Sequence, residues 1–129
     1  MWYTGKDVTE ESSVSMIGHA TSNDGITWIR NPLPVLAATY SWEHDSVMCP
    51  FVLYDERKRI YRMWYSAGDS YEPLAIGHAI SCDGIHWNKT HSTPIFSPDS
   101  SYNWESHRVA GPAVVYNGTM IFLGLIRPF

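Results

Sequence analysis

The segment IGHATSNDGITW at residues 17–28 occurs a second time, as IGHAISCDGIHW at residues 76–87, with nine of twelve positions identical. A repeat of this kind determines the architecture, so it is considered before any local pattern. Each copy joins an alternating strand pattern to an Asp-Gly pair, which is typical of a tight turn between strands. The segment therefore indicates a repeating β unit.

Two further anchors recur with nearly the same spacing. The offset is 62 for both anchors and 59 for the twelve-residue segment. The recurring pairs are Met1-Trp2-Tyr3 with Met63-Trp64-Tyr65, and Trp42-Glu43 with Trp104-Glu105. Residues 1–129 are therefore predicted to form a single partial domain of two units, about 1–62 and 63–129.

Each unit is predicted to contain four strands joined by turns. No stretch shows a sustained helical period, and Pro and Gly cluster between the apolar segments. The Asn117-Gly118 pair predicts one hairpin turn. The expected strands are 1–4, 17–22, a segment through Trp28, 51–54, 60–66, 76–81, a segment through Trp87, 113–116 and 120–126.

Small residues share one face of the strand at 17–22, because side chains alternate along a strand. They are Gly18, Ala20 and Ser22, and the strand at 76–81 repeats the pattern. Such a face lets a neighbouring sheet pack closely with its bulky Trp and Tyr side chains, as in radially stacked sheets. The predicted fold class is an all-β β-propeller of four-stranded antiparallel blades, with about two blades per chain.

Two blades cannot close a propeller by themselves, because repeat folds need about three or more stacked units. Two interpretations follow. The chain is either a piece of a longer propeller or one subunit of a homo-oligomer whose chains complete one another.

The composition excludes several classes of partner. The chain has 13 acidic and 9 basic residues, which argues against nucleic-acid binding and against a polybasic membrane surface. No apolar run approaches the roughly 20 residues that span a bilayer, and the N-terminus lacks the features of a signal peptide. The expected location is cytoplasmic by default. The histidines lack a close ligand spacing, so no metal and no cofactor are predicted.

The repeated motifs resemble those of the five-bladed β-propeller glycosidase superfamily, which includes the family 43 and family 32 glycoside hydrolases and related uncharacterised propellers. The resemblance rests on Met63–Ala67, on the segment 76–87 and on Pro94-Ile95-Phe96. It implies a propeller fold and a carbohydrate ligand at the end of the central channel. It also implies catalytic carboxylates on the innermost strands, close to a proline.

Two segments of this chain match the family's acid motifs, Met48-Cys49-Pro50 and Ala110-Gly111-Pro112. The prolines are present, but Met48 and Ala110 stand where the family has a glutamate. Neither side chain can transfer a proton. The resemblance therefore leaves open whether the chain is an enzyme.

Other carboxylates precede the innermost strands, and glycoside hydrolysis needs two of them within about 5–9.5 Å of each other. Asp45 is the leading candidate, because its equivalent in the second unit is His107 and chemistry is expected where the repeat breaks. Glu43 and Glu105 are equivalent, so they either support the repeat or donate a proton. The candidate substrate-binding residues are His44, Arg108, His107, Trp42 and Trp104.

Two functions from different classes remain open at this point. The first is a glycosidase-like propeller that binds a carbohydrate at the channel and either hydrolyses it or only holds it. The second is a non-catalytic propeller module that binds a glycan or serves as an oligomeric scaffold.

Overall fold

The computed structural model describes residues 1–8, 13–117 and 121–126, the last of these ranges as backbone. Within these residues the chain forms strands and two short 3-10 helices, and none of the helices is long and apolar enough to cross a membrane. The elements are β1 (Trp2–Val8), β2 (Ser13–Thr21), β3 (Ile29–Arg30), η1 (Ser41–Glu43), β4 (Ser46–Asp55), β5 (Ile60–Asp69), β6 (Glu72–Ser81), β7 (Asn88–Lys89), η2 (Asn103–Glu105), β8 (Ala110–Tyr116) and β9 (Ile121–Ile126).

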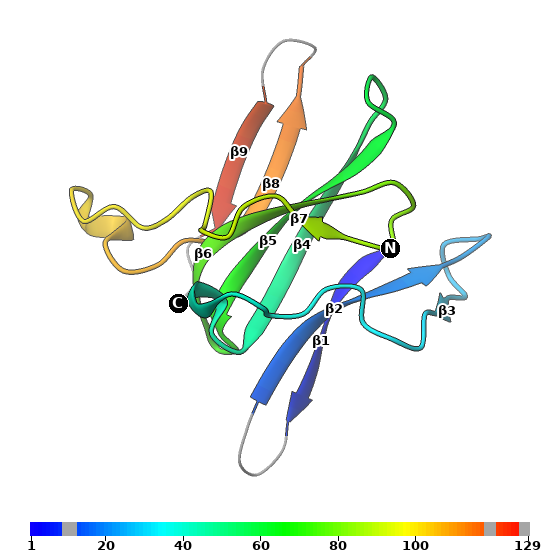
Figure 1. The fold of residues 1–129 in the computed structure, drawn as a ribbon, viewed down its shortest axis with the longest axis horizontal. Helices are drawn as coiled ribbons and strands as arrows, with labels where there is room; N and C mark the ends of the chain where they lie inside the picture. Colours follow the sequence, from blue (N-terminus) through cyan, green and yellow to red (C-terminus); the bar gives the residue numbers. More distant parts are fainter. Residues whose placement is uncertain (9–12, 118–120, 127–129) are drawn as a thin grey trace.

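The strands of the described residues form three antiparallel sheets in chain order, β1-β2-β3, β4-β5-β6-β7 and β8-β9. Figure 1 shows them arranged one after another, with the four-stranded sheet in the middle. The middle sheet is a complete blade with β4 as its first strand. The first sheet has strands equivalent to β5, β6 and β7, and the third has strands equivalent to β4 and β5. The predicted all-β propeller of four-stranded blades is confirmed.

The fourth strand of each unit is much shorter than the pattern predicts, and this expectation is wrong. β3 and β7 contain two residues each and begin after the tryptophans. The cause is the Asp-Gly turn, in which Asp83 Oδ1 accepts hydrogen bonds of 2.8 Å from the backbone N–H groups of Ile85 and His86. These bonds hold the chain in the turn up to Trp87. Two other expected features, Met120 and the Gly118 half of the Asn-Gly turn, lie outside the described residues.

The core lies in two layers between the sheets. The first layer is between the first and middle sheets and contains Ile17, Val47 and Met63, none of which is exposed. The second is between the middle and third sheets and contains Ile76 and Val114. Each layer buries one face of a sheet against the next, as stacked propeller blades require.

The small residues of the repeated strand have a role that differs from the expected one. Gly77 lies opposite Tyr65 in the β5–β6 pair, and a Cβ atom at Gly77 would be 2.4 Å from Tyr65 Cζ. Gly18 stands in the same relation to Tyr3, at 2.6 Å. The glycine therefore makes room for a tyrosine ring of its own sheet, and not for a side chain of the neighbouring sheet.

His78 lies on the face of β6 opposite to Gly77. Its packing makes the stability of the fold depend on pH. Its ring centroid is 5.0 Å from that of Trp64, and its Nδ1 is 2.9 Å from Thr90 Oγ1. Burial, with smaller contributions from Arg62 and His91, lowers the pKa of His78 from 6.5 to about 4. Between these two pH values the unfolded chain therefore binds a proton at His78 that the folded chain does not bind.

We expect the stability contributed by neutral His78 to be complete above pH 6.5 and to be lost as the pH falls from 6.5 to about 4. After allowance for solvent screening, the loss should be about 1–2 kcal/mol. Urea unfolding of the wild type and of His78→Gln at pH 7 and pH 4.5 measures it. An equal loss of stability in both proteins would contradict the assignment.

Candidate functional site

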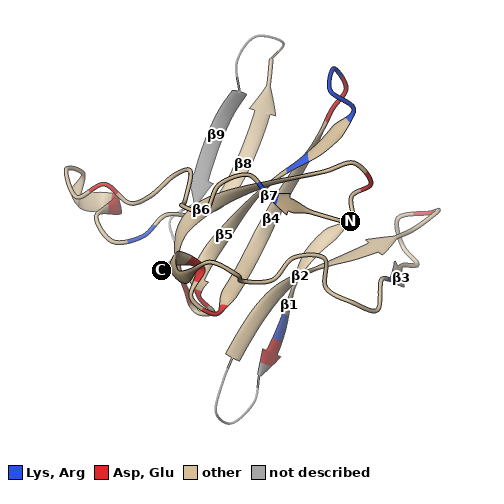
Figure 2. Cartoon of the chain, in the orientation of Figure 1, with Lys and Arg blue, Asp and Glu red and all other residues tan. Residues whose placement is uncertain are grey.

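Three strand ends of the middle sheet meet at one end of the molecule. β4 begins there at Ser46, β5 ends at Asp69 and β6 begins at Glu72, because neighbouring strands are antiparallel. Figure 2 shows acidic residues at this end, whereas the basic residues of the β4–β5 turn lie at the opposite end. We call the region around Ser46, Asp69 and Glu72 the acidic end. The predicted site segments before β4 and β8 lead to it.

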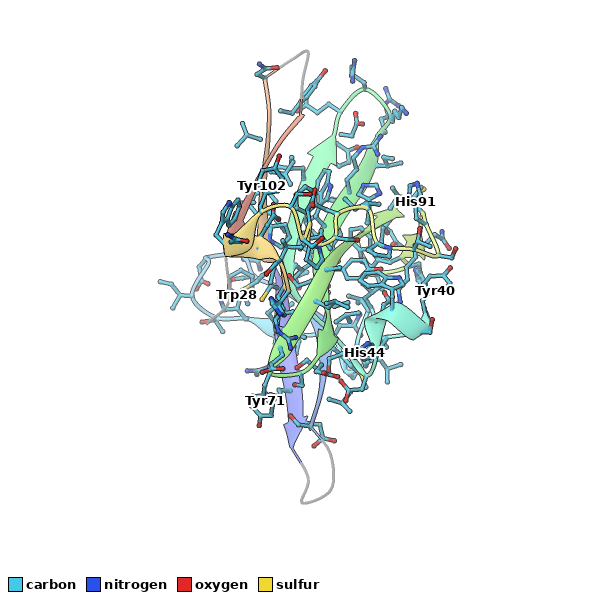
Figure 3. The ribbon with its side chains drawn as sticks, turned by 90° about the vertical axis from the view of Figure 1, so that its left-hand side faces the viewer. Trp28, Tyr40, His44, Tyr71, His91 and Tyr102 are labelled. Carbon is cyan, nitrogen blue, oxygen red and sulfur yellow. The ribbon has the colours of Figure 1, made fainter. Side chains whose placement is uncertain are left out.

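Asp45 is exposed at the acidic end and is held by its neighbour. Its Oδ1 accepts a hydrogen bond of 2.8 Å from Ser46 Oγ, which in turn accepts one of 2.9 Å from the backbone N–H of Ser15. His44 precedes it with a φ of 50°, a left-handed conformation that is uncommon outside glycine. His44 Nδ1 lies 2.9 Å from Asp69 Oδ1. Figure 3 labels His44 beside η1 at this end.

Arg108 reaches the acidic end from the third sheet. Its guanidinium donates to the Glu72 backbone carbonyl at 2.8 Å and to Glu72 Oε2 at 2.6 Å. His107 is exposed beside it, with Nδ1 2.8 Å from Ser106 Oγ. The β5–β6 turn is thus flanked by His44 on one side and Arg108 on the other.

Asp69 and Glu72 were missed as site residues in the sequence. They hold His44 and Arg108 through pairs separated by 25 and 36 residues, which no local pattern reveals. The only sequence signal is a two-residue turn, Ser70-Tyr71, with an acid on either side and Gly68 before it. Figure 3 shows Tyr71 at the tip of this turn.

The two segments that match the family's acid motifs form β-bulges. The pairing of β4 with β5 shifts register between Met48 and Phe51, and Cys49 has a φ of 53°. In β8 the equivalent shift follows Ala110, and Gly111 has a φ of 70°. Bulges and left-handed residues are frequent beside active sites. Here Met48 and Ala110 are 5% and 4% exposed, so apolar side chains are buried where the family has its acid.

Glu43 is fully buried in a network of donors. Its Oε2 accepts from Tyr65 Oη at 2.7 Å, and its Oε1 lies 2.6 Å from Lys89 Nζ. The backbone N–H groups of Thr39 and Tyr40 donate to the same Oε1 at 2.9 Å. Burial alone would raise the pKa of Glu43, but Lys89 and the other donors outweigh it and lower the pKa. This set, the Glu43 box, favours the structural interpretation of that residue.

The repeat-equivalent Glu105 lacks such a box. It is 8% exposed, and within the described part of the chain its buried Oε2 has no hydrogen-bond donor. Trp42 stacks on Tyr65 with ring centroids 6.3 Å apart and an interplanar angle of 22°, whereas Trp104 is 60% exposed. The two Trp-Glu pairs therefore occupy equivalent positions in unequal surroundings.

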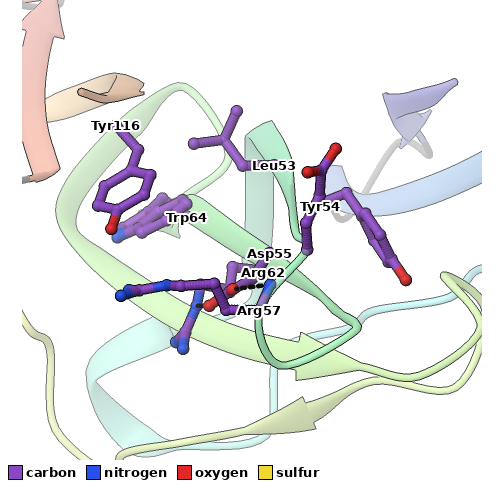
Figure 4. A pocket seen from close by; sticks show the side chains of 8 residues that line it. Leu53, Tyr54, Asp55, Arg57, Arg62, Trp64 and Tyr116 are labelled. Carbon is purple, nitrogen blue, oxygen red and sulfur yellow. Dashed lines mark hydrogen bonds and ion pairs between the residues drawn. The ribbon is translucent and has the colours of Figure 1, made fainter. Parts of the chain in front are cut away.

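A cavity of about 250 Å³ lies at the opposite end of β4. Figure 4 shows its lining, where Asp55 Oδ2 accepts from Arg62 Nε at 3.1 Å and Trp64 lies behind them. The Arg57 guanidinium lies 5.2 Å from the ring centroid of Tyr116. The sequence did not predict this cavity.

Among the described residues no group of three or more His, Cys, Asp or Glu could hold a metal ion.

Solved structures with a similar fold are glycoside hydrolases. One, described as a glycoside hydrolase, is 20% identical and has a TM-score of 0.74 over 95% of this chain and 35% of its own. The GH32 β-fructofuranosidase of Bombyx mori is 16% identical, with a TM-score of 0.73 over 96% of this chain and 25% of its own. A thermostable family-43 glycoside hydrolase is 22% identical, with a TM-score of 0.72 over 95% and 42%.

No protein-family model and no curated protein matches the chain. The resemblance to the five-bladed propellers of families 43 and 32 is therefore confirmed at the level of the fold. This chain spans between 25% and 42% of the length of the three enzymes.

Proposed function

We propose that this chain is a glycosidase-like propeller module that binds a carbohydrate at the acidic end. Asp45 is the leading ligand-binding carboxylate, and His44, His107 and Arg108 are the further residues proposed to bind the sugar.

One observation carries this proposal: Asp45 is an exposed carboxylate that breaks the repeat, at an end of the middle sheet that also holds two side-chain pairs. The pairs are His44 with Asp69 and Arg108 with Glu72. Carboxylates accept hydrogen bonds and guanidinium groups donate them. The acidic end can therefore accept hydrogen bonds from sugar hydroxyls and donate hydrogen bonds to them. The glycoside hydrolase fold makes a sugar the first ligand to test.

Binding without hydrolysis is the form of the function that we favour. Met48 and Ala110 are buried at the family's acid positions and have no proton to give. Hydrolysis is the second candidate, with Asp45 and a proton donor at Glu105 or Glu43. Of these two donors we favour Glu105, because Glu43 is occupied by five hydrogen bonds in its box.

We expect Asp45→Asn to weaken oligosaccharide binding about tenfold, the usual loss for a charge-assisted hydrogen bond. Calorimetric titration with a panel of neutral and acidic oligosaccharides measures it. Glu56→Gln at the opposite end is the matched control and should bind like the wild type. Unchanged binding by Asp45→Asn would rule out Asp45, and a loss in Glu56→Gln alone would place the site at the cavity that Glu56 lines.

An assay on aryl glycosides separates the two candidates. No hydrolysis together with saturable binding supports the module. Hydrolysis that Asp45→Ala abolishes supports the enzyme, and hydrolysis that this variant leaves unchanged rules out Asp45.

We also propose that chains associate into a homo-oligomer that closes the propeller. The first and third sheets each have fewer strands than the complete middle blade, so a neighbouring chain could supply the remaining strands.

A further inference from the structure

We propose that Trp104 and Glu105 of one chain dock on the first sheet of a second copy, where Tyr3 and Arg30 supply the donors that Glu105 lacks. This inference rests on the proposed homo-oligomer and names the residues of the contact between two chains, which we call the joint. It begins from the Glu43 box, which shows how the glutamate of a Trp-Glu pair is surrounded by donors.

The Glu43 box joins the segment before β4 to two later strands of the same sheet. Tyr65 on β5 donates a hydroxyl hydrogen bond, and Lys89 on β7 supplies the ammonium group. Lys89 also donates to the backbone carbonyl of Ala37 and to Thr39 Oγ1, both at 2.7 Å. A complete box therefore needs one tyrosine on the second strand and one cation on the fourth.

The first sheet carries both donors at equivalent register positions. Tyr3 lies opposite Gly18, as Tyr65 lies opposite Gly77. Arg30 pairs with Ala20 on β2, as Lys89 pairs with Ala79 on β6. Within the described residues neither the Tyr3 hydroxyl nor the Arg30 guanidinium has a side-chain partner.

A cavity of about 320 Å³ lies where a Trp-Glu pair would sit on the first sheet. Tyr3 and Gly18 line it, together with Asn31 and Pro34 from the segment after β3. On the middle sheet the equivalent tyrosine is covered by the stacked Trp42 ring. The exposed Trp104 thus fits the space over Tyr3, and this brings Glu105 to the Tyr3 hydroxyl.

Charge complementarity favours a second copy as the occupant. Glu105 Oε2 is buried and has no donor among the residues that the structure describes, which is costly until a cation or hydroxyl reaches it. Arg30 is exposed on the first sheet of every chain. Each chain therefore carries one incomplete acceptor and one complementary set of donors, which is the condition for a head-to-tail interface.

The joint requires an exchange of strands. β1 and β9 are both equivalent to β5, so the partner's β1 pairs with β8 along the edge that β9 holds in the isolated chain. β9 has one neighbouring strand, whereas β1 is backed by β2 and β3. The exchange replaces a two-stranded ribbon, which is marginal alone, by a four-stranded sheet.

A charge-swap experiment on the full chain tests the joint. Sedimentation velocity over a range of concentrations gives the mass of the wild type, Glu105→Arg, Arg30→Glu and the double variant. Each single variant should weaken association more than about tenfold, because a buried pair loses its partner, and the double variant should restore it. Lys58→Glu, an exposed cation on the β4–β5 turn, is the matched control and should associate like the wild type.

Each outcome has one meaning. A monomeric wild type overturns both the homo-oligomer and this joint, while carbohydrate binding by Asp45 is measured separately and stands or falls alone. An oligomer that neither single variant weakens overturns the joint and leaves the homo-oligomer. Oligomers lost in both single variants but not recovered in the double variant also overturn the pairing of Glu105 with Arg30. Circular dichroism of each variant identifies one that fails to fold, and for such a variant Glu105→Gln and Arg30→Gln replace the reversals with the same expected loss.

Discussion

Replacing Glu43 by glutamine is expected to lower the free energy of unfolding by about 3–5 kcal/mol, the cost of breaking a buried ion pair. The change leaves the Lys89 ammonium, whose side chain is 8% exposed, without its carboxylate. Tyr65 and two backbone N–H groups lose a charged acceptor at the same time. Urea unfolding followed by tryptophan fluorescence measures the loss.

A double-mutant cycle shows that the loss belongs to the pair. Lys89→Met alone should destabilise the chain strongly as well, because the Glu43 carboxylate then loses its cation. Glu43→Gln combined with Lys89→Met should cost clearly less than the sum of the two changes. Additive costs, or single changes below about 1 kcal/mol, would show that the box contributes little.

The second large effect is expected from Gly77→Ala, which should cost about 3 kcal/mol. The new Cβ would lie 2.4 Å from Tyr65 Cζ and 2.5 Å from its hydroxyl oxygen. Tyr65 is completely buried, so its ring can move only by disturbing the Trp42 stack and the hydrogen bond to Glu43. Thermal and urea unfolding should both report the loss.

Gly5→Ala is the matched control for this change. Gly5 also lies in a strand, but the nearest atom to its added Cβ is the Met16 backbone oxygen at 3.8 Å, an ordinary contact. We expect a change within about 0.5 kcal/mol. Similar losses at Gly77 and Gly5 would show that the clash with Tyr65 is not the cause.

Much of the fold could be predicted because a repeat exposes its own constraints. Gly77 and Tyr65 recur as Gly18 and Tyr3, since every blade needs the same close approach of a ring to a backbone. The strand ends were less predictable. Hydrogen bonds donated to the Asp83 side chain by Ile85 and His86 hold the residues before Trp87 in the turn, and apolar periodicity does not indicate such turns.

The candidate site was predictable only in part. Asp45 and Arg108 are visible in the sequence as departures from the repeat. Asp69 and Glu72, which contact His44 and Arg108, are not visible in this way, because a side-chain pair between distant segments leaves no local pattern. Glu43 and Glu105 are equivalent in the repeat, although the first has five donors and the buried oxygen of the second has none among the described residues.

The sequence by itself determined the blade. Alternation, Asp-Gly turns and the doubled segment IGHATSNDGITW are local or periodic features, and they are sufficient to predict the repeat, its turns and the first three strands of a blade. Only the tertiary structure decided how equivalent residues differ. Whether Glu43 or Glu105 finds its hydroxyl and its cation depends on which strands stack beside it, and that neighbourhood is set by the order of the sheets and not by the residue's own segment.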